Sequence, residues 1–190
     1  MKARFAIAAT LSALALLSGC TQQEEPPVDR TPLPSVAAPP YACDYIPLDA
    51  VRLMTGVRDP IVDGSFNLEG AEKLGIGGCF AYQPTGDKAK VLNVSLSPGG
   101  SKEEAEHRIR TGAKRLPDIV PGAVGYLVQD GSADNTHAAA VLIREPARLI
   151  VELVRGVKGR DNAADVVALT KLIAPKLITD ASAPSPSTKD

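Results

Sequence analysis

The sequence predicts a single α+β domain, with an antiparallel sheet of about five strands and helices packed on it in the order α-ββ-α-βββ-α. Short apolar or alternating segments are separated by tight-turn residues, which favours antiparallel neighbours. A helix with a clear N-terminal cap interrupts these segments, and another helix follows them. Hydrophobic residues make up 44% of the 190 residues, which is enough for one folded core.

The first expected element is a short helix over residues 48–55. Val51, Leu53 and Met54 give it an apolar side. Gly56 is suited to the residue after its C-terminus, because glycine adopts a left-handed conformation freely.

Two strands are expected next. A glycine-rich run at 75–78 leads into the first strand, at 79–82, and residues 84–87 form a turn. Residues 91–97 alternate between apolar and polar side chains, which is typical of a strand with one buried face.

A capping box predicts the second helix. Ser101 occupies the N-cap position and Glu104 lies three residues later. Pro117 is expected to end this helix. Its apolar stripe is expected to consist of Ala105, Ile109, Ala113 and Leu116.

Three further strands are expected at 124–129, 137–144 and 147–154. The last two are strongly apolar, so we expect them in the centre of the sheet beneath helices. Asp161 caps a final helix, which runs through 163–172 and is expected to end near Pro175.

The N-terminus has the features of a signal peptide over residues 1–19. Basic residues precede an apolar run at 5–17 that is too short to span a membrane comfortably. Leu17-Ser18-Gly19-Cys20 then resembles the lipobox of bacterial lipoproteins. The resemblance implies cleavage before Cys20, a diacylglyceryl thioether on its thiol with acyl chains such as palmitate, and a lipid anchor on the extracytoplasmic face of the cell membrane.

The remaining chain divides into three parts. Residues 20–41 are rich in proline, which fixes φ and removes backbone donors, so we expect a lipid-anchored tether that extends over roughly 60 Å. Residues 42–178 are expected to form the α+β domain. The polar stretch at 179–190 is expected to be a disordered tail.

Cys43 and Cys79 are the cysteines that remain beside Cys20. In an exported protein such a pair predicts a disulfide. It would close a loop of about 37 residues and stabilise the fold by roughly 4 kcal/mol in the chain-entropy account. The alternatives are a metal site, for which no further His or Cys lies nearby in the sequence, and a reactive thiol.

The lipobox and tether are followed by Cys43-Asp44-Tyr45-Ile46-Pro47, a helix ending at Thr55-Gly56, the second cysteine and Val120-Pro121-Gly122. This arrangement resembles a family of small actinobacterial lipoproteins classed as a domain of unknown function. The resemblance covers nearly all of 20–178 and implies a two-cysteine α+β domain without an established active site. A weaker likeness to the extracytoplasmic sensor domains of mycobacterial receptor kinases implies a sensor-type ligand-binding domain.

Charge and composition exclude several function classes. Lys and Arg number 21 and Asp and Glu number 22, so the chain has no basic field for nucleic acid. Aromatic residues make up only 4%, which counts against stacking platforms for bases or sugars. We find no sequence motif for a metal site, a phosphate-binding loop or a catalytic serine, and we expect no cofactor.

The favoured hypothesis is a non-catalytic binding or accessory module at the cell envelope. Besides membrane lipid, its partner would be an envelope protein, a cell-wall component or a small apolar ligand bound in a cleft between the sheet and the helices. The alternatives are a structural spacer and an envelope hydrolase. The hydrolase would use converging carboxylates such as Asp44, Asp63 or Asp134.

Overall fold

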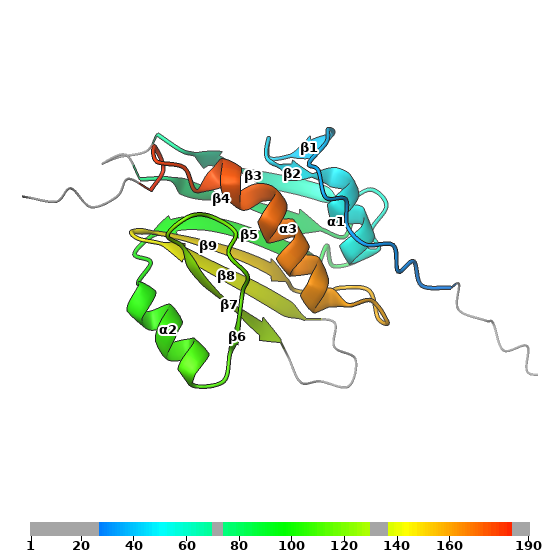
Figure 1. Cartoon of the computed structure of the whole chain (residues 1–190). Coiled ribbons are helices and arrows are strands. Elements are labelled where there is room, and N and C mark those ends of the chain that lie inside the picture. Colours follow the sequence, from blue (N-terminus) through cyan, green and yellow to red (C-terminus); the bar gives the residue numbers. More distant parts are fainter. Residues whose placement is uncertain (1–26, 70–73, 130–136, 184–190) are drawn as a thin grey trace, which may run out of the picture.

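The computed structural model describes residues 27–69, 74–129 and 137–183. In this part of the chain, three helices accompany a seven-stranded antiparallel sheet and a two-stranded sheet, which confirms the α+β class (Figure 1). The small sheet pairs β1 (Tyr41–Ala42) with β2 (Ile46–Pro47). The large sheet has the order β3 (Ile61–Asn67), β4 (Ile76–Tyr82), β5 (Lys90–Pro98), β9 (Ala147–Leu153), β8 (Ala138–Arg144), β7 (Val124–Gln129) and β6 (Lys114–Arg115). The helices are α1 (Leu48–Thr55), α2 (Lys102–Arg110) and α3 (Asn162–Leu177).

The large sheet consists of two antiparallel runs of strands. In one run, β3, β4 and β5 are neighbours in the sheet in the same order as in the sequence, and in the other run so are β7, β8 and β9. Strand β9 also pairs with β5 and so joins the two runs. This pairing sets Val94 opposite Val151, and Asn93 opposite Glu152. Because successive residues of a strand point to opposite faces, the two pairs lie on different sides of the sheet.

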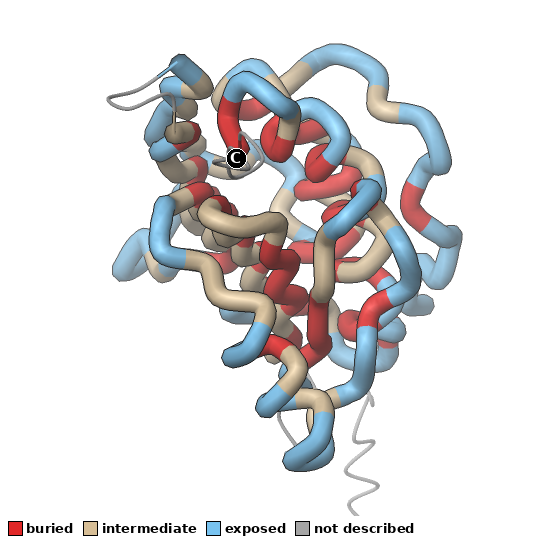
Figure 2. The backbone as a smooth tube through the Cα atoms, turned by 60° about the vertical axis from the view of Figure 1, so that its left-hand side comes forward, coloured by how far each residue is buried: buried red, intermediate tan, exposed pale blue. Residues whose placement is uncertain are grey.

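One face of the sheet carries the main core. Helix α3 crosses this face (Figure 1) and buries Val166, Leu169 and Ile173 against apolar side chains of the central strands, including Leu142 and Leu149. Buried residues concentrate along the central strands and on the helices that meet them, while the loops are exposed (Figure 2). The two strongly apolar strands, β8 and β9, therefore lie in the centre of the sheet, as expected.

Helix α2 covers only part of the opposite face. Ala105 packs with Tyr126, Val141 and Ile143, which lie on β7 and β8. The cluster beneath α2 reaches Ile150 of β9, and no residue of β3, β4 or β5 in the described part of the chain belongs to it.

Several expected element boundaries are confirmed. Helix α1 spans 48–55 and is followed by Gly56 with a φ of 71°. Strand β7 also has the expected bounds. Ser101 caps α2, since its Oγ accepts a hydrogen bond from the Glu104 N–H at 3.3 Å.

The sheet has more strands than the five expected. Strand β3 gives little sequence signal, because most of its residues are exposed and Gly64 lies at its centre. The glycine run at 75–78 belongs largely to a strand rather than preceding one, because β4 begins at Ile76.

Helix α2 ends earlier than expected. It stops at Arg110, before Gly112, whose φ is 112°. Lys114 then pairs with Leu127 of β7 and forms the edge strand β6. The expected apolar stripe is therefore divided, and Ala113 lies beyond the helix.

The C-terminal part of the domain extends further than expected. Pro175 lies inside α3, because it removes only its own N–H, while Ile178 N–H still donates to the Ala174 carbonyl at 2.8 Å. The first residues of the expected tail pack on the domain. The carbonyl of Ser182 accepts a hydrogen bond from Gly75 N–H at 2.9 Å, and Ala183 is fully buried.

Candidate functional site

A disulfide joins Cys43 and Cys79, as predicted, across 36 residues of sequence. Their Cα atoms are 5.9 Å apart. Cys79 is buried on β4, between its register partners Gly64 on β3 and Val94 on β5. The bridge therefore fastens the segment that precedes α1 to the interior of the sheet.

The segment 27–41, expected to be a free tether, lies against the domain, and we call it the strap. It runs alongside α3 (Figure 1). Leu33 is buried and belongs to the main core. Near the other end of the strap, Lys176 of α3 places its Nζ 4.9 Å from the centre of the Tyr41 ring. The strap is thus held at several points along the length of the helix.

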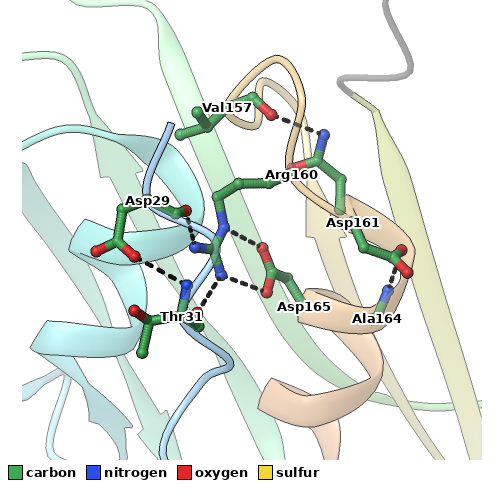
Figure 3. Close-up of polar contacts among 8 residues, drawn as sticks. Asp29, Thr31, Val157, Arg160, Asp161, Ala164 and Asp165 are labelled. Carbon is green, nitrogen blue, oxygen red and sulfur yellow. Dashed lines mark hydrogen bonds and ion pairs between the residues drawn. The ribbon is translucent and has the colours of Figure 1, made fainter. Parts of the chain in front are cut away.

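Arg160 holds the strap near its N-terminal end (Figure 3). The guanidinium donates to the backbone carbonyls of Asp29 and Thr31, the second at 3.0 Å from Nη2. It also makes a two-pronged ion pair with Asp165 of α3, in which Nε–Oδ2 and Nη2–Oδ1 are both 2.8 Å. The side chains of Arg160 and Asp165 are only 3% and 6% exposed, so the ion pair is buried.

The charges of this cluster follow from its hydrogen bonds. The bond to Asp165 raises the pKa of Arg160 above its ordinary value, although burial opposes this shift. The Thr31 N–H donates to Asp29 Oδ1 at 2.8 Å and lowers the pKa of Asp29. The strap carbonyls therefore face a cation that stays charged at any physiological pH.

Proline explains why the strap is bound through its carbonyls. A proline lacks an N–H but keeps its C=O, so a proline-rich segment cannot add a strand to a sheet but can still accept hydrogen bonds. Sequence reasoning considered only the missing donors. The signal for this cluster was Asp165, an acidic residue that is buried in the first turn of the mostly apolar α3.

The uncovered part of the sheet is the second candidate. We call it the polar face, and it consists of Asp63, Ser65, Phe80, Asn93, Ser95, Ser97, Arg148 and Glu152, with the apolar Ile150 between the last two on β9. The strand register aligns these residues in rows, such as Phe80, Asn93 and Glu152 on β4, β5 and β9. Lys90 lies over the Phe80 ring, with Nζ 4.6 Å from its centre.

Glu152 is the centre of a small polar network on this face. Asn93 Nδ2 donates to its Oε2 at 2.9 Å, and His137 Nε2 lies 3.3 Å from its Oε1. The hydrogen bond from Asn93 lowers the pKa of Glu152, burial opposes this, and His137 and then Lys90 lower the pKa further. Glu152 is therefore a carboxylate at neutral pH.

Two polar atoms of the polar face are buried without a hydrogen-bond partner among the described residues: Asn93 Oδ1 and Arg148 Nε. Leaving such atoms unpaired is costly, so most buried polar groups in proteins are paired. Tyr126 lies close enough to interact with the charge of Arg148, and burial raises the pKa of the tyrosine hydroxyl. This face therefore offers one acceptor and one donor that no described residue uses.

The cavities lie elsewhere. The largest one described, about 580 Å³, lies at the β6–β7 edge and is lined by Arg108 and Lys114 among others. One of about 210 Å³ lies between β6 and the start of α3, and one of about 560 Å³ lies beside the Arg144–Asp180 ion pair. None of these three is lined by a polar-face residue, and each has charged side chains in its wall.

Two of the carboxylates proposed for a hydrolase, Asp44 and Asp63, lie at or beside strand β3. Asp63 lies opposite Phe80 on the edge strand β3, and its backbone carbonyl is 3.7 Å from Cys43 Sγ, so Asp44 is near the same strand. Neither carboxylate lines the cavities above. Asp134 and Cys20, the residue expected to carry lipid, lie outside the described residues.

Two searches of the described residues gave no candidate. No group of three His, Cys, Asp or Glu side chains in 27–69, 74–129 and 137–183 could hold a metal ion. Over the same ranges, each helix is too short or too polar to cross a lipid bilayer.

Comparisons of the chain with protein-family models, with curated protein sequences and with solved structures gave no match.

Proposed function

We propose that this chain is a lipid-anchored, extracytoplasmic binding module without catalytic activity, and that its polar face binds a polar surface of an envelope protein. The observation that carries the proposal is the pair of unsatisfied atoms on this face, Asn93 Oδ1 and Arg148 Nε. Both atoms are buried in the unbound chain, so a partner that supplies one donor and one acceptor would satisfy them once the two side chains turn outward.

The spacing of these atoms favours a macromolecule. Asn93 lies four residues along β5 from Ser97, the residue opposite Arg148. At about 3.3 Å per residue, the two positions are separated by about 13 Å along the strands. A small apolar molecule would instead need an enclosed apolar cavity, and the described cavities are open and partly charged.

The aromatic content of the face favours protein over polysaccharide. Sugars are commonly recognised by stacking on exposed aromatic rings. Phe80 is the aromatic residue of the polar face, and Lys90 already occupies one side of its ring. Hydroxyl, amide and charged side chains make up most of the remaining surface, which suits the backbone and side chains of a protein.

The test places a photo-crosslinking residue at Ser95, in the middle of the polar face, in the full-length protein in its exporting host. A matched probe is placed at Lys171, which is exposed on α3. The protein captured from Ser95 is then purified, and its affinity for the mature chain is measured by calorimetry.

The bulky substitution Ser95→Tyr is expected to weaken this affinity by about tenfold or more, as at a central interface position. The control Lys171→Tyr is expected to leave the affinity unchanged. The proposal is contradicted if Ser95 yields no specific adduct, or if the Ser95→Tyr variant binds the purified protein as tightly as the natural chain does.

A further inference from the structure

We infer that one end of the domain lies against anionic phospholipid headgroups, through a surface that we call the basal patch: Val28, Arg30, Arg58, Val154 and Arg155. The inference rests on the proposed lipid anchor at Cys20. It deepens that proposal by naming the surface of the domain that meets the membrane.

The first argument is the length of chain between the anchor and the domain. The strap is fixed at Asp29, whose carbonyl accepts a hydrogen bond from the buried Arg160 (Figure 3). The connection from Cys20 to Asp29 has about nine residues and spans at most about 30 Å when fully extended. This is half of the reach expected for a free tether, so the end of the domain where the strap leaves must stay near the bilayer.

The second argument is that several loops meet at this end. A Cβ atom on Gly159, in the β9–α3 loop, would lie 3.5 Å from Val28 of the strap. In the same loop, Val157 N–H donates to the carbonyl of Met54 at 3.2 Å, so the end of α1 also lies there. The loop after α1 carries Arg58. The strap, the β9–α3 loop and the loop after α1 thus form one surface.

The third argument is the chemistry of that surface. Val28 and Val154 are each 37% exposed, and they are among the few large apolar side chains of the described chain that reach solvent to this extent. The three arginines of the patch are exposed. None of them forms an ion pair in the described residues, whereas Arg52 pairs with Asp49.

Three acidic residues lie nearby, and none of them forms an ion pair with the arginines of the patch among the described residues. Asp29 accepts a hydrogen bond from Thr31 N–H, and Asp161 accepts one from Ala164 N–H as the cap of α3. Asp59 is exposed beside Arg58. Exposed valines among unpaired arginines match the headgroup layer, which presents phosphates at its surface and apolar chains beneath.

The test measures how close two positions lie to the membrane. The acylated full-length protein is reconstituted into vesicles that contain phosphatidylglycerol and a headgroup-labelled quencher lipid. A fluorophore is attached to a cysteine introduced by Val154→Cys, or by Glu103→Cys as the control, with the native disulfide intact. Glu103 is exposed near the start of α2, where Lys102 N–H donates to the side chain of Glu145 beside the β8–β9 turn. That turn is at the other end of β9 from Val154.

We expect the label at position 154 to be quenched about twofold or more strongly than the label at 103, because only the former lies in the headgroup layer. The double variant Arg58→Gln, Arg155→Gln should remove most of this difference. The matched control Arg108→Gln, Arg110→Gln removes the same number of charges from α2. It should leave the quenching difference between positions 154 and 103 unchanged. Vesicles of phosphatidylcholine alone should also reduce the quenching at position 154.

Two results would overturn the inference separately from the proposed function. Equal quenching at both positions in an acylated, vesicle-bound protein contradicts the orientation while the anchor stands. Quenching at 154 that is unaffected by the Arg58 and Arg155 substitutions contradicts the headgroup contact. A protein that lacks acyl chains and does not float with the vesicles contradicts the anchor, and the orientation with it.

Discussion

At the scale of single residues, Arg160 explains how a proline-rich segment becomes part of the folded domain. Its guanidinium satisfies two strap carbonyls and both oxygens of Asp165 at once. Only a planar group with several fixed donors can make all of these bonds, so lysine is not an equivalent replacement. The N-terminal part of the strap is therefore held by one side chain that is about 130 residues away in the sequence.

This gives the first prediction. Arg160→Met leaves the buried carboxylate of Asp165 unpaired and should lower the free energy of unfolding by about 3 kcal/mol or more. Arg160→Lys keeps the charge but loses the two-pronged geometry, so its effect should be smaller. Urea unfolding of the mature chain measures both. A loss below about 1 kcal/mol for the methionine variant would show that the cluster does not hold the strap.

The second prediction concerns Glu152 and pH. Its pKa in the folded state is lowered, chiefly by the Asn93 hydrogen bond. A carboxyl group whose folded pKa is depressed stabilises the fold above its ordinary pKa, and this contribution is lost as the pH falls through the folded value. The stability difference between the natural chain and Glu152→Gln should therefore be largest at neutral pH, begin to fall as the pH drops below the ordinary pKa of glutamate, 4.5, and be lost below the lowered pKa of the folded state. Urea midpoints at neutral and acidic pH measure this difference, and a constant difference would disprove the assignment.

At the scale of elements, the β3–β4 hairpin depends on glycines with positive φ. Gly64 has a φ of 118°, and a Cβ atom there would lie 2.2 Å from the Gly78 carbonyl oxygen. Gly77 has a φ of 151° and would place a Cβ 2.3 Å from the Ser65 carbonyl oxygen. The two strands can approach and twist only because both side chains are absent.

The third prediction uses this constraint. Gly64→Ala should lower the free energy of unfolding by about 2–3 kcal/mol, because backbone strain and a clash with the neighbouring strand add together. The matched control is Gly86→Ala: Gly86 also has a positive φ, of 68°, but has nothing near its Cβ position. Its cost should be about 1 kcal/mol. Thermal unfolding of both variants measures these losses of stability. Equal losses for Gly64→Ala and Gly86→Ala would contradict the prediction, because they would mean that the clash at Gly64 is relieved.

The elements also show where local sequence patterns are sufficient. Helix α1 and strand β7 were predicted at their observed bounds, and for α1 the local signal is Gly56, which follows the last helical residue. Strand β3 could not be predicted, because edge strands need little apolar surface and are held by pairing with a neighbour. Helix α2 was predicted too long because the pairing of Lys114 with Leu127 overrides helical periodicity.

At the scale of the whole molecule, the candidate sites arise from contacts between distant parts of the chain. The disulfide was predictable because two cysteines besides Cys20, in a chain expected to be exported, have few alternatives. The Glu152 network was not, because it requires β5 and β9 to be neighbours, and this places Asn93 beside a residue 59 positions away. The position of the strap could not be predicted from the sequence either. A high proline content excludes helix and strand, but it does not exclude packing of the segment on the domain.

The fourth prediction concerns this global architecture. Replacing both Cys43 and Cys79 by alanine should lower the free energy of unfolding by about 4 kcal/mol, because the bridge restricts the unfolded chain over 36 residues. The effect is measured by urea unfolding under oxidising conditions. Reduction of the natural chain should have the same effect as the substitution. Equal stability with and without the bridge would contradict its structural role.

The central claim is that this domain is held at a membrane by a lipid on Cys20. Its most direct test is the intact mass of the full-length chain after expression in an exporting bacterium and extraction with detergent, with Cys20→Ala as the control. The account predicts a chain that begins at Cys20 and carries a diacylglyceryl group, together with a control that is not acylated. A natural chain that keeps Met1, or that is cleaved without gaining lipid, would contradict the claim.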